Sequence, residues 1–163
     1  MQILRSSAWG RTTMTAEQQR RVLVVDDDAT IRELLCTVLR DRGLSVDEAG
    51  DGKEALDRID SRPYGVIVID LLMPLLDGFT VIEALKALTP RPVVLVVTAA
   101  ERSAIDGLDP AIVHGIIRKP FDHEEVANVV AACAEIRARM PLETMALAMA
   151  AGGSLWALLN RLI

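Results

Sequence analysis

Acidic side chains, a hydroxyl and a lysine directly follow the apolar runs of this sequence. The acids are Asp26, Asp27 and Asp70, and Thr98 and Lys119 follow later runs in the same way. Carboxylates that lie together raise one another's pKa unless a cation joins them, and Mg²⁺ suits them because it prefers hard oxygen ligands. A lysine and a hydroxyl can hold phosphoryl oxygens, and an aspartate can be the nucleophile that becomes an aspartyl phosphate. The set therefore predicts phosphoryl chemistry beside a Mg²⁺ ion.

Apolar runs that alternate with helical patterns would bring these side chains together. Continuous apolar runs predict strands at 22–25, 66–69 and 93–97. A weaker run predicts a strand at 45–49, and 113–117 is predicted to be the last strand. Helical spacing predicts helices at 31–39, 52–59, 78–88 and 123–139, with at most a short helix within 101–108. This order is typical of an α/β fold, a parallel sheet with helices on both faces. Its ligand site lies at the carboxyl ends of the strands.

The composition excludes several other classes of protein. The chain has 163 residues, of which 51% are apolar and 25% charged, so a sizeable core can form. A net charge of −5 and an aromatic content of 3% argue against a nucleic-acid-binding surface. Two cysteines are too few for a disulfide scaffold and fit a reducing cytosol, so we expect a cytoplasmic protein.

The sequence divides into three segments: a polar, disordered arm (1–20), a folded domain (21–140) and an apolar helical tail (141–163). The tail carries an apolar stripe of Leu155, Leu158, Leu159 and Leu162. This stripe could pack on the domain, dock to a partner or a second copy in a homodimer, or bind a membrane surface. Its uncharged stretch is shorter than the about 20 residues that a membrane span needs, so we expect no transmembrane helix. The tail is also too short for a helix-turn-helix, so we expect no direct DNA binding.

Five short motifs occur in order along residues 21–139. They are Val24-Val25-Asp26-Asp27, Asp70-Leu71-Leu72-Met73-Pro74, Asp77-Gly78, Val97-Thr98-Ala99 and Lys119-Pro120-Phe121. With these motifs the chain resembles the receiver domain of response regulators in bacterial two-component signal transduction. The resemblance implies a flavodoxin-like, doubly wound sheet of five parallel strands in the order 2-1-3-4-5. Because the tail is too short for a helix-turn-helix output domain, we expect a stand-alone receiver.

The resemblance implies a role for each residue of the site. Asp70 would accept a phosphoryl group from the phosphohistidine of a sensor histidine kinase or a histidine phosphotransfer protein. Thr98 and Lys119 would hold that group. The Mg²⁺ ligands would be Asp26, Asp27, Asp70 and the main-chain carbonyl of Leu72. The protein would then signal to a downstream protein through contacts, rather than turn over a substrate as an enzyme.

The resemblance also concerns the backbone near the site. The Lys119–Pro120 bond would be cis, a minority state of X–Pro bonds. Gly78 would permit the turn into the next helix. Ile116 stands where many receivers have Tyr or Phe, so the coupling of Thr98 to the outer surface would run without an aromatic flip.

Two apolar residues affect the expected lifetime of a phosphoryl group on Asp70. Leu72 and Ala100 follow Asp70 and Thr98 by two positions. Neither side chain can orient an attacking water through a polar contact. We therefore expect slow autodephosphorylation.

Two other functions stay open on the residues alone. Asp26-Asp27-Asp28-Ala29-Thr30 fits the D-x-D-x-T pattern of haloacid-dehalogenase-type phosphatases, with Asp26 as nucleophile and Asp28 as general acid. No acidic pair ends a strand after Lys119, and this interpretation leaves Asp70 unexplained. The second alternative is a phosphate-independent docking module with the same fold, against which the complete set of acids, threonine and lysine argues.

Several polar residues have structural interpretations. Asp28 is expected to cap a helix and Asp77 to form a turn. His114 is expected at an edge or in solvent. Cys36 and Cys133 fall on helices that would be neighbours, and we expect buried, inert thiols.

Overall fold

The five predicted strands form one parallel sheet, in the order 2-1-3-4-5. The computed structural model describes residues 14–139. The strands are β1 (Arg21–Val25), β2 (Ser45–Ala49), β3 (Val66–Ile69), β4 (Val93–Thr98) and β5 (Val113–Arg118). The helices are α1 (Ala16–Gln19), α2 (Ala29–Asp41), α3 (Gly52–Ser61), α4 (Gly78–Leu85), α5 (Arg102–Ile105) and α6 (His123–Arg139). The predicted fold class and strand order are confirmed.

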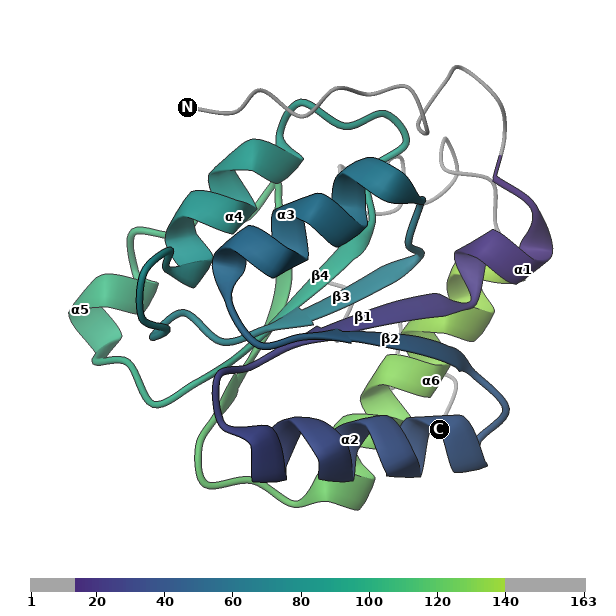
Figure 1. The fold of residues 1–163 in the computed structure, drawn as a ribbon, viewed down its shortest axis with the longest axis horizontal. Helices are drawn as coiled ribbons and strands as arrows, with labels where there is room; N and C mark the ends of the chain where they lie inside the picture. Colours follow the sequence, from purple (N-terminus) through teal and green to yellow (C-terminus); the bar gives the residue numbers. More distant parts are fainter. Residues whose placement is uncertain (1–13, 140–163) are drawn as a thin grey trace.

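Two apolar cores lie on opposite faces of the sheet, because successive side chains of a strand point to opposite faces. Leu23 and Ile67 belong to the core under α3 and α4. Val24 and Val68 belong to the core under α2 and α6. Figure 1 shows the sheet between these two pairs of helices. The central strands β1 and β3 are covered on both faces, which explains why their sequences are continuously apolar.

Aspartates and a glycine set the ends of the helices. Asp28 caps α2 by accepting the amides of Thr30 (2.9 Å) and Ile31 (3.3 Å), as predicted. Asp77 does more than form a turn, since it caps α4. At the other end of α2, Gly43 has a φ of 75° and its amide bonds to the carbonyl of Arg40. This left-handed conformation suits glycine and ends the helix.

Helix α4 is shorter than the predicted span of 78–88. After Leu85 the amides of Ala87 and Leu88 bond to carbonyls three residues back, so the last turn tightens. Leu88 is nevertheless buried, which explains why the apolar pattern extended to it.

Residues 14–20, which we expected in a disordered arm, are ordered. Thr15 and Gln18 form a capping box at α1. Arg20 pairs with Glu135 of α6 at 3.0 Å, and Met14 is buried in the core. The Arg20–Glu135 pair joins residues far apart in the sequence, so no local pattern could reveal it, whereas the capping box is a local pattern. The remaining arm (1–13) and the tail (140–163) lie outside the described residues. Between residues 14 and 139, no helix is both long and apolar enough to cross a membrane.

Strand β5 carries a bulge at His114. Val94 pairs with Val113 and Leu95 with Gly115, so His114 is the extra residue. Its Nδ1 accepts the amide of Val94 at 3.1 Å, so the imidazole satisfies this backbone donor. Burial, and after it the charge of Arg137, lowers the pKa of His114 to about 4. The edge position is as expected, but His114 is a structural residue rather than a solvated one.

The two cysteines lie on neighbouring helices, as predicted, since α2 packs against α6. Cys36 and Cys133 are free thiols and fully buried. Burial raises the pKa of Cys36 to about 11 and that of Cys133 to about 12. These features favour inert thiols over a redox pair.

Candidate functional site

The candidate site lies at the carboxyl ends of four neighbouring strands. Asp26 follows β1, Asp70 follows β3, Thr98 ends β4 and Lys119 follows β5. The strands are parallel and adjacent, so their carboxyl ends meet at one edge of the sheet. The topology therefore brings together residues that are up to 93 positions apart.

Lys119 joins the two most buried acids of the site. Its Nζ lies 2.7 Å from Oδ2 of Asp26 and 2.7 Å from Oδ2 of Asp70. Asp26 is 2% exposed and Asp70 is 5% exposed, so water screens these pairs weakly. Burial alone would lower the pKa of Lys119, but its bonds to the two carboxylates outweigh burial and leave that pKa raised. The lysine is therefore held as a cation.

Asp26, Asp27 and Asp70 offer a set of oxygen ligands for a metal ion. One carboxylate oxygen from each lies within 4.8 Å of the others, with Asp26 and Asp70 buried and Asp27 exposed. Burial raises the pKa of Asp26, and its bond to Lys119 only partly offsets this. An all-oxygen set that opens to solvent through one ligand fits a hard divalent cation such as Mg²⁺, which keeps part of its water shell.

Backbone amides orient the two buried carboxylates. Oδ1 of Asp26 accepts the amide of Asp28 at 2.9 Å, and Oδ1 of Asp70 accepts the amide of Leu72 at 3.0 Å. Each carboxylate thus turns its Oδ2 to Lys119. A Cβ atom on Gly78 would overlap the carbonyl oxygen of Asp70. Glycine is required there because the backbones approach closely, rather than for a left-handed turn.

Thr98 lies at the site but does not yet contact the acids. It is fully buried, and its Oγ1 accepts the amide of Ala100 at 3.2 Å. Among the described residues, no hydrogen bond joins its hydroxyl to Asp70 or Lys119. Its carbonyl accepts the amide of Lys119 at 3.0 Å, which fixes the start of the loop after β5. The Lys119–Pro120 bond in that loop is cis, as predicted.

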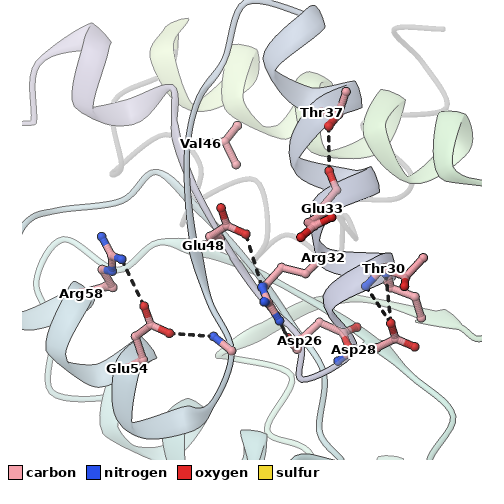
Figure 2. A network of polar contacts seen from close by, with 12 residues as sticks. Asp26, Asp28, Thr30, Arg32, Glu33, Thr37, Val46, Glu48, Glu54 and Arg58 are labelled. Atoms are coloured by element: carbon pink, nitrogen blue, oxygen red, sulfur yellow. Dashed lines mark hydrogen bonds and ion pairs between the residues drawn. The ribbon is translucent and has the colours of Figure 1, made fainter.

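The guanidinium of Arg32, which was not predicted from the sequence, holds the backbone after Asp26. Nη1 of Arg32 donates to the carbonyl of Asp26 at 2.7 Å, and Nε donates to Glu48 of β2 at 3.3 Å. Figure 2 shows Arg32 lying between these two partners. The contact fixes the peptide that leads from Asp26 to Asp27. No local motif predicts this contact, because Arg32 lies on α2 and Glu48 lies on β2, whereas Asp26 follows β1.

A protein-family model described as the response regulator receiver domain matches residues 22–131. The chain belongs to this family. The response regulator MprA of Mycolicibacterium vanbaalenii is 42% identical over 108 residues, which are 65% of this chain and 46% of that protein. MprA of Mycobacterium avium is likewise 42% identical over 108 residues, with 65% and 47% covered. The chain thus spans about half the length of the curated relatives it matches.

Solved receiver structures share the fold. A CheY-like receiver domain protein from Methanospirillum hungatei aligns with a TM-score of 0.65 and 29% identity, over 74% of this chain and 98% of that chain. The response regulator protein TrrA from Thermotoga maritima, solved in complex with Mg²⁺-BeF, aligns with a TM-score of 0.61 and 29% identity. That alignment covers 69% of this chain and 97% of TrrA. The predicted family and its flavodoxin-like fold are confirmed.

The family places this chain among the signalling domains of two-component systems. Receiver domains bind Mg²⁺ at an acidic pocket, and the cluster of Asp26, Asp27 and Asp70 fits such an ion. The arrangement also argues against the phosphatase alternative. In that alternative Asp28 would be a general acid, whereas here its Oδ1 caps α2.

Proposed function

We propose that this receiver accepts a phosphoryl group on Asp70 in a Mg²⁺-dependent reaction and signals through protein contacts. The observation that carries the proposal is the lysine bridge. One buried ammonium contacts both Asp26 and Asp70 at 2.7 Å, at the edge of the sheet where parallel strands present a ligand site. A structural ion pair would need one carboxylate, whereas a phosphoryl site needs a ligand acid, an acceptor acid and a cation.

The acceptor step would be an in-line transfer to an oxygen of Asp70. A bond forms between this oxygen and phosphorus while the bond from phosphorus to the donor nitrogen breaks, and that nitrogen keeps the electron pair. Lys119 would hold one phosphoryl oxygen and remain protonated, since its pKa is raised. Thr98 would donate its hydroxyl hydrogen to another. The phosphoaspartate carries more negative charge than the carboxylate, so these donors favour the product.

Asp26, Asp27, Asp70 and the main-chain carbonyl of Leu72 would hold the Mg²⁺ ion. When bound, the ion supplies positive charge that offsets the charge of the incoming phosphoryl group. Asp26 and Asp70 are oriented for this by the amides of Asp28 and Leu72. Arg32 contributes by holding the peptide before Asp27.

The phosphodonor would be a phosphohistidine on a sensor histidine kinase or a histidine phosphotransfer protein in the cytoplasm. The output would be contact with a downstream protein or a second copy of the chain. Leu72 is apolar and exposed, and Ala100 is buried, so neither would align a hydrolytic water. We therefore expect a long-lived phosphoaspartate. A half-life of only seconds would contradict this expectation.

The proposal is tested by incubating the protein with Mg²⁺ and acetyl phosphate and measuring its intact mass. The expected gain is one phosphoryl group, about 80 Da, on an aspartate oxygen. Asp70→Asn should abolish the gain, whereas Asp28→Asn should keep it because Asp28 caps a helix. Labelling of Asp70→Asn would contradict the assignment.

If acetyl phosphate adds no mass, Mg²⁺ binding measured by calorimetry shows how this result is to be interpreted. Some receivers do not use small donors, so Mg²⁺ binding without labelling calls for a phosphohistidine donor. Absence of both would indicate the phosphate-independent docking module. That module would bind its partner equally well with Asp70→Asn.

A further inference from the structure

Ala100 is the point at which two side chains hold the loop between β4 and α5. Its amide donates to Oγ1 of Thr98 at 3.2 Å, and its carbonyl accepts a hydrogen bond from Nη1 of Arg118. Ala100 itself is buried. Both polar backbone groups of one buried residue are thus satisfied by side chains, one from β4 and one from β5. The contacts form a continuous link from Thr98 through Ala100 to Arg118.

Arg118 stands outside the acidic cluster. It ends β5 and is exposed, and it lies two residues after the exposed Ile116, so the two share a face of the sheet. Thr98 and Arg118 are paired residues of β4 and β5. The guanidinium therefore reaches across the end of β4 to the loop, while the neighbouring Lys119 enters the pocket.

We propose that Arg118 is a positioning residue that holds this loop in its unphosphorylated arrangement and so opposes the reorientation of Thr98 toward a phosphoryl group. This inference rests on the proposed function of Asp70. The Thr98 hydroxyl is engaged with the amide of Ala100 and bonds to no acid of the site among residues 14–139. To reach a phosphoryl oxygen it must turn into the pocket.

Turning Thr98 costs one of the two contacts at Ala100. If Ala100 follows Thr98, its carbonyl moves away from Arg118. If Ala100 stays with Arg118, its amide loses Oγ1 of Thr98. A hydrogen bond of this kind contributes about 1 kcal/mol net, so removal of the guanidinium should strengthen binding of a phosphoryl group about three- to tenfold.

The hydrogen bond from Arg118 to Ala100 should weaken binding of a phosphoryl group, whereas the positive charge of Arg118 should strengthen it, because a nearby cation attracts the phosphoryl anion. Arg102 provides the matched control. It is the first residue of α5 and is exposed, and its side chain makes no hydrogen bond or ion pair within residues 14–139. Arg102→Ala removes the same charge from the same region without touching Ala100.

The test is a titration with beryllofluoride, a phosphoryl mimic, in the presence of Mg²⁺, followed by backbone amide NMR. Arg118→Ala should bind beryllofluoride about three- to tenfold more tightly than Arg102→Ala. The free Arg118→Ala protein should also show a shifted Ala100 amide resonance. Arg118→Lys keeps a donor and should return affinity toward that of the unsubstituted chain. Affinity equal to or weaker than that of Arg102→Ala would overturn the inference.

Two further measurements separate the ways in which the experiment could fail. Urea unfolding checks that Arg118→Ala is folded, and Arg118→Met, which retains the aliphatic stem, takes its place if it is not. If the unsubstituted chain fails to bind beryllofluoride, or if Asp70→Asn binds it equally well, the proposed function is wrong and the inference falls with it. Normal binding with no effect of Arg118 overturns the inference alone.

Discussion

Lys119→Met tests whether the lysine bridge is what keeps the buried acids compatible with folding. Among residues 14–139, Lys119 is the one side-chain cation that forms an ion pair with both Asp26 and Asp70. Methionine has a similar length but no charge. The variant therefore leaves two buried carboxylates, and the exposed Asp27 close to them, without a compensating ammonium.

The expected loss of stability follows from burial. Removing one partner of a fully buried ion pair costs about 3–5 kcal/mol, because it strands an uncompensated charge. The Lys119 side chain is 16% exposed, so some water already reaches it. We therefore expect a loss of about 2–4 kcal/mol at neutral pH in the absence of Mg²⁺.

The loss should depend on pH with a definite sign. The pKa of Asp26 is already raised above 3.8 by burial, and Lys119 opposes this rise. Without the lysine the pKa rises further, so the folded state holds a proton that the unfolded state has released. The stability of the variant should then fall as pH rises from about 4 toward neutrality, more steeply than that of the unsubstituted chain.

The assay is urea unfolding followed by circular dichroism, at several pH values and with or without Mg²⁺. Lys53→Met is the matched control, because Lys53 makes an exposed pair with Asp57 at 3.8 Å that should contribute little. Mg²⁺ should restore much of the stability of Lys119→Met. Equal stability of the two variants at neutral pH, or destabilisation that grows as pH falls, would refute this reasoning.

Three further predictions concern other parts of the fold. The His114 pKa of about 4 lies below the ordinary 6.5, so stability should fall as pH drops through this window, by at most about 3 kcal/mol. His114→Gln should flatten this dependence in urea unfolding, and an unchanged slope would contradict the bulge argument. Gly78→Ala should destabilise the protein by about 1–3 kcal/mol in the same assay, because its methyl group would meet the Asp70 backbone, and a neutral effect would contradict this. The two buried cysteines should not react with a thiol reagent until urea unfolds the chain, and rapid labelling of the native protein would show that they are accessible.

The sheet and most of the site could be predicted because both depend on local patterns. The continuous apolar runs mark strands that are covered on both faces, as the full burial of β3 and β4 shows. The polar residues that follow such runs must lie at one edge of a parallel sheet. For this reason Asp26, Asp70 and Lys119 could be placed together without any knowledge of distances.

Other features could not be predicted, because they depend on contacts between distant residues. Arg32 becomes part of the site only through Glu48 and the carbonyl of Asp26. Arg137 would be expected at the helix surface, yet it is 2% exposed and donates to the carbonyl of Arg91. His114 looks like an ordinary edge residue until the register between β4 and β5 shows the bulge.

The charges of the site link its stability to its proposed chemistry. Three carboxylates lie close together, and one lysine contacts two of them, so a single positive charge cannot neutralise the cluster. Burial raises the pKa of Asp26, and the charge of Asp70 adds to this rise, so keeping Asp26 ionised costs folding free energy. Protonation, a divalent cation or loss of one carboxylate should each relieve it. Asp70→Asn should therefore be more stable than the unsubstituted chain without Mg²⁺ and should gain less from added Mg²⁺. A phosphoacceptor site of this kind lowers the stability of its own metal-free form, and that cost is also what gives a divalent cation its affinity for the pocket.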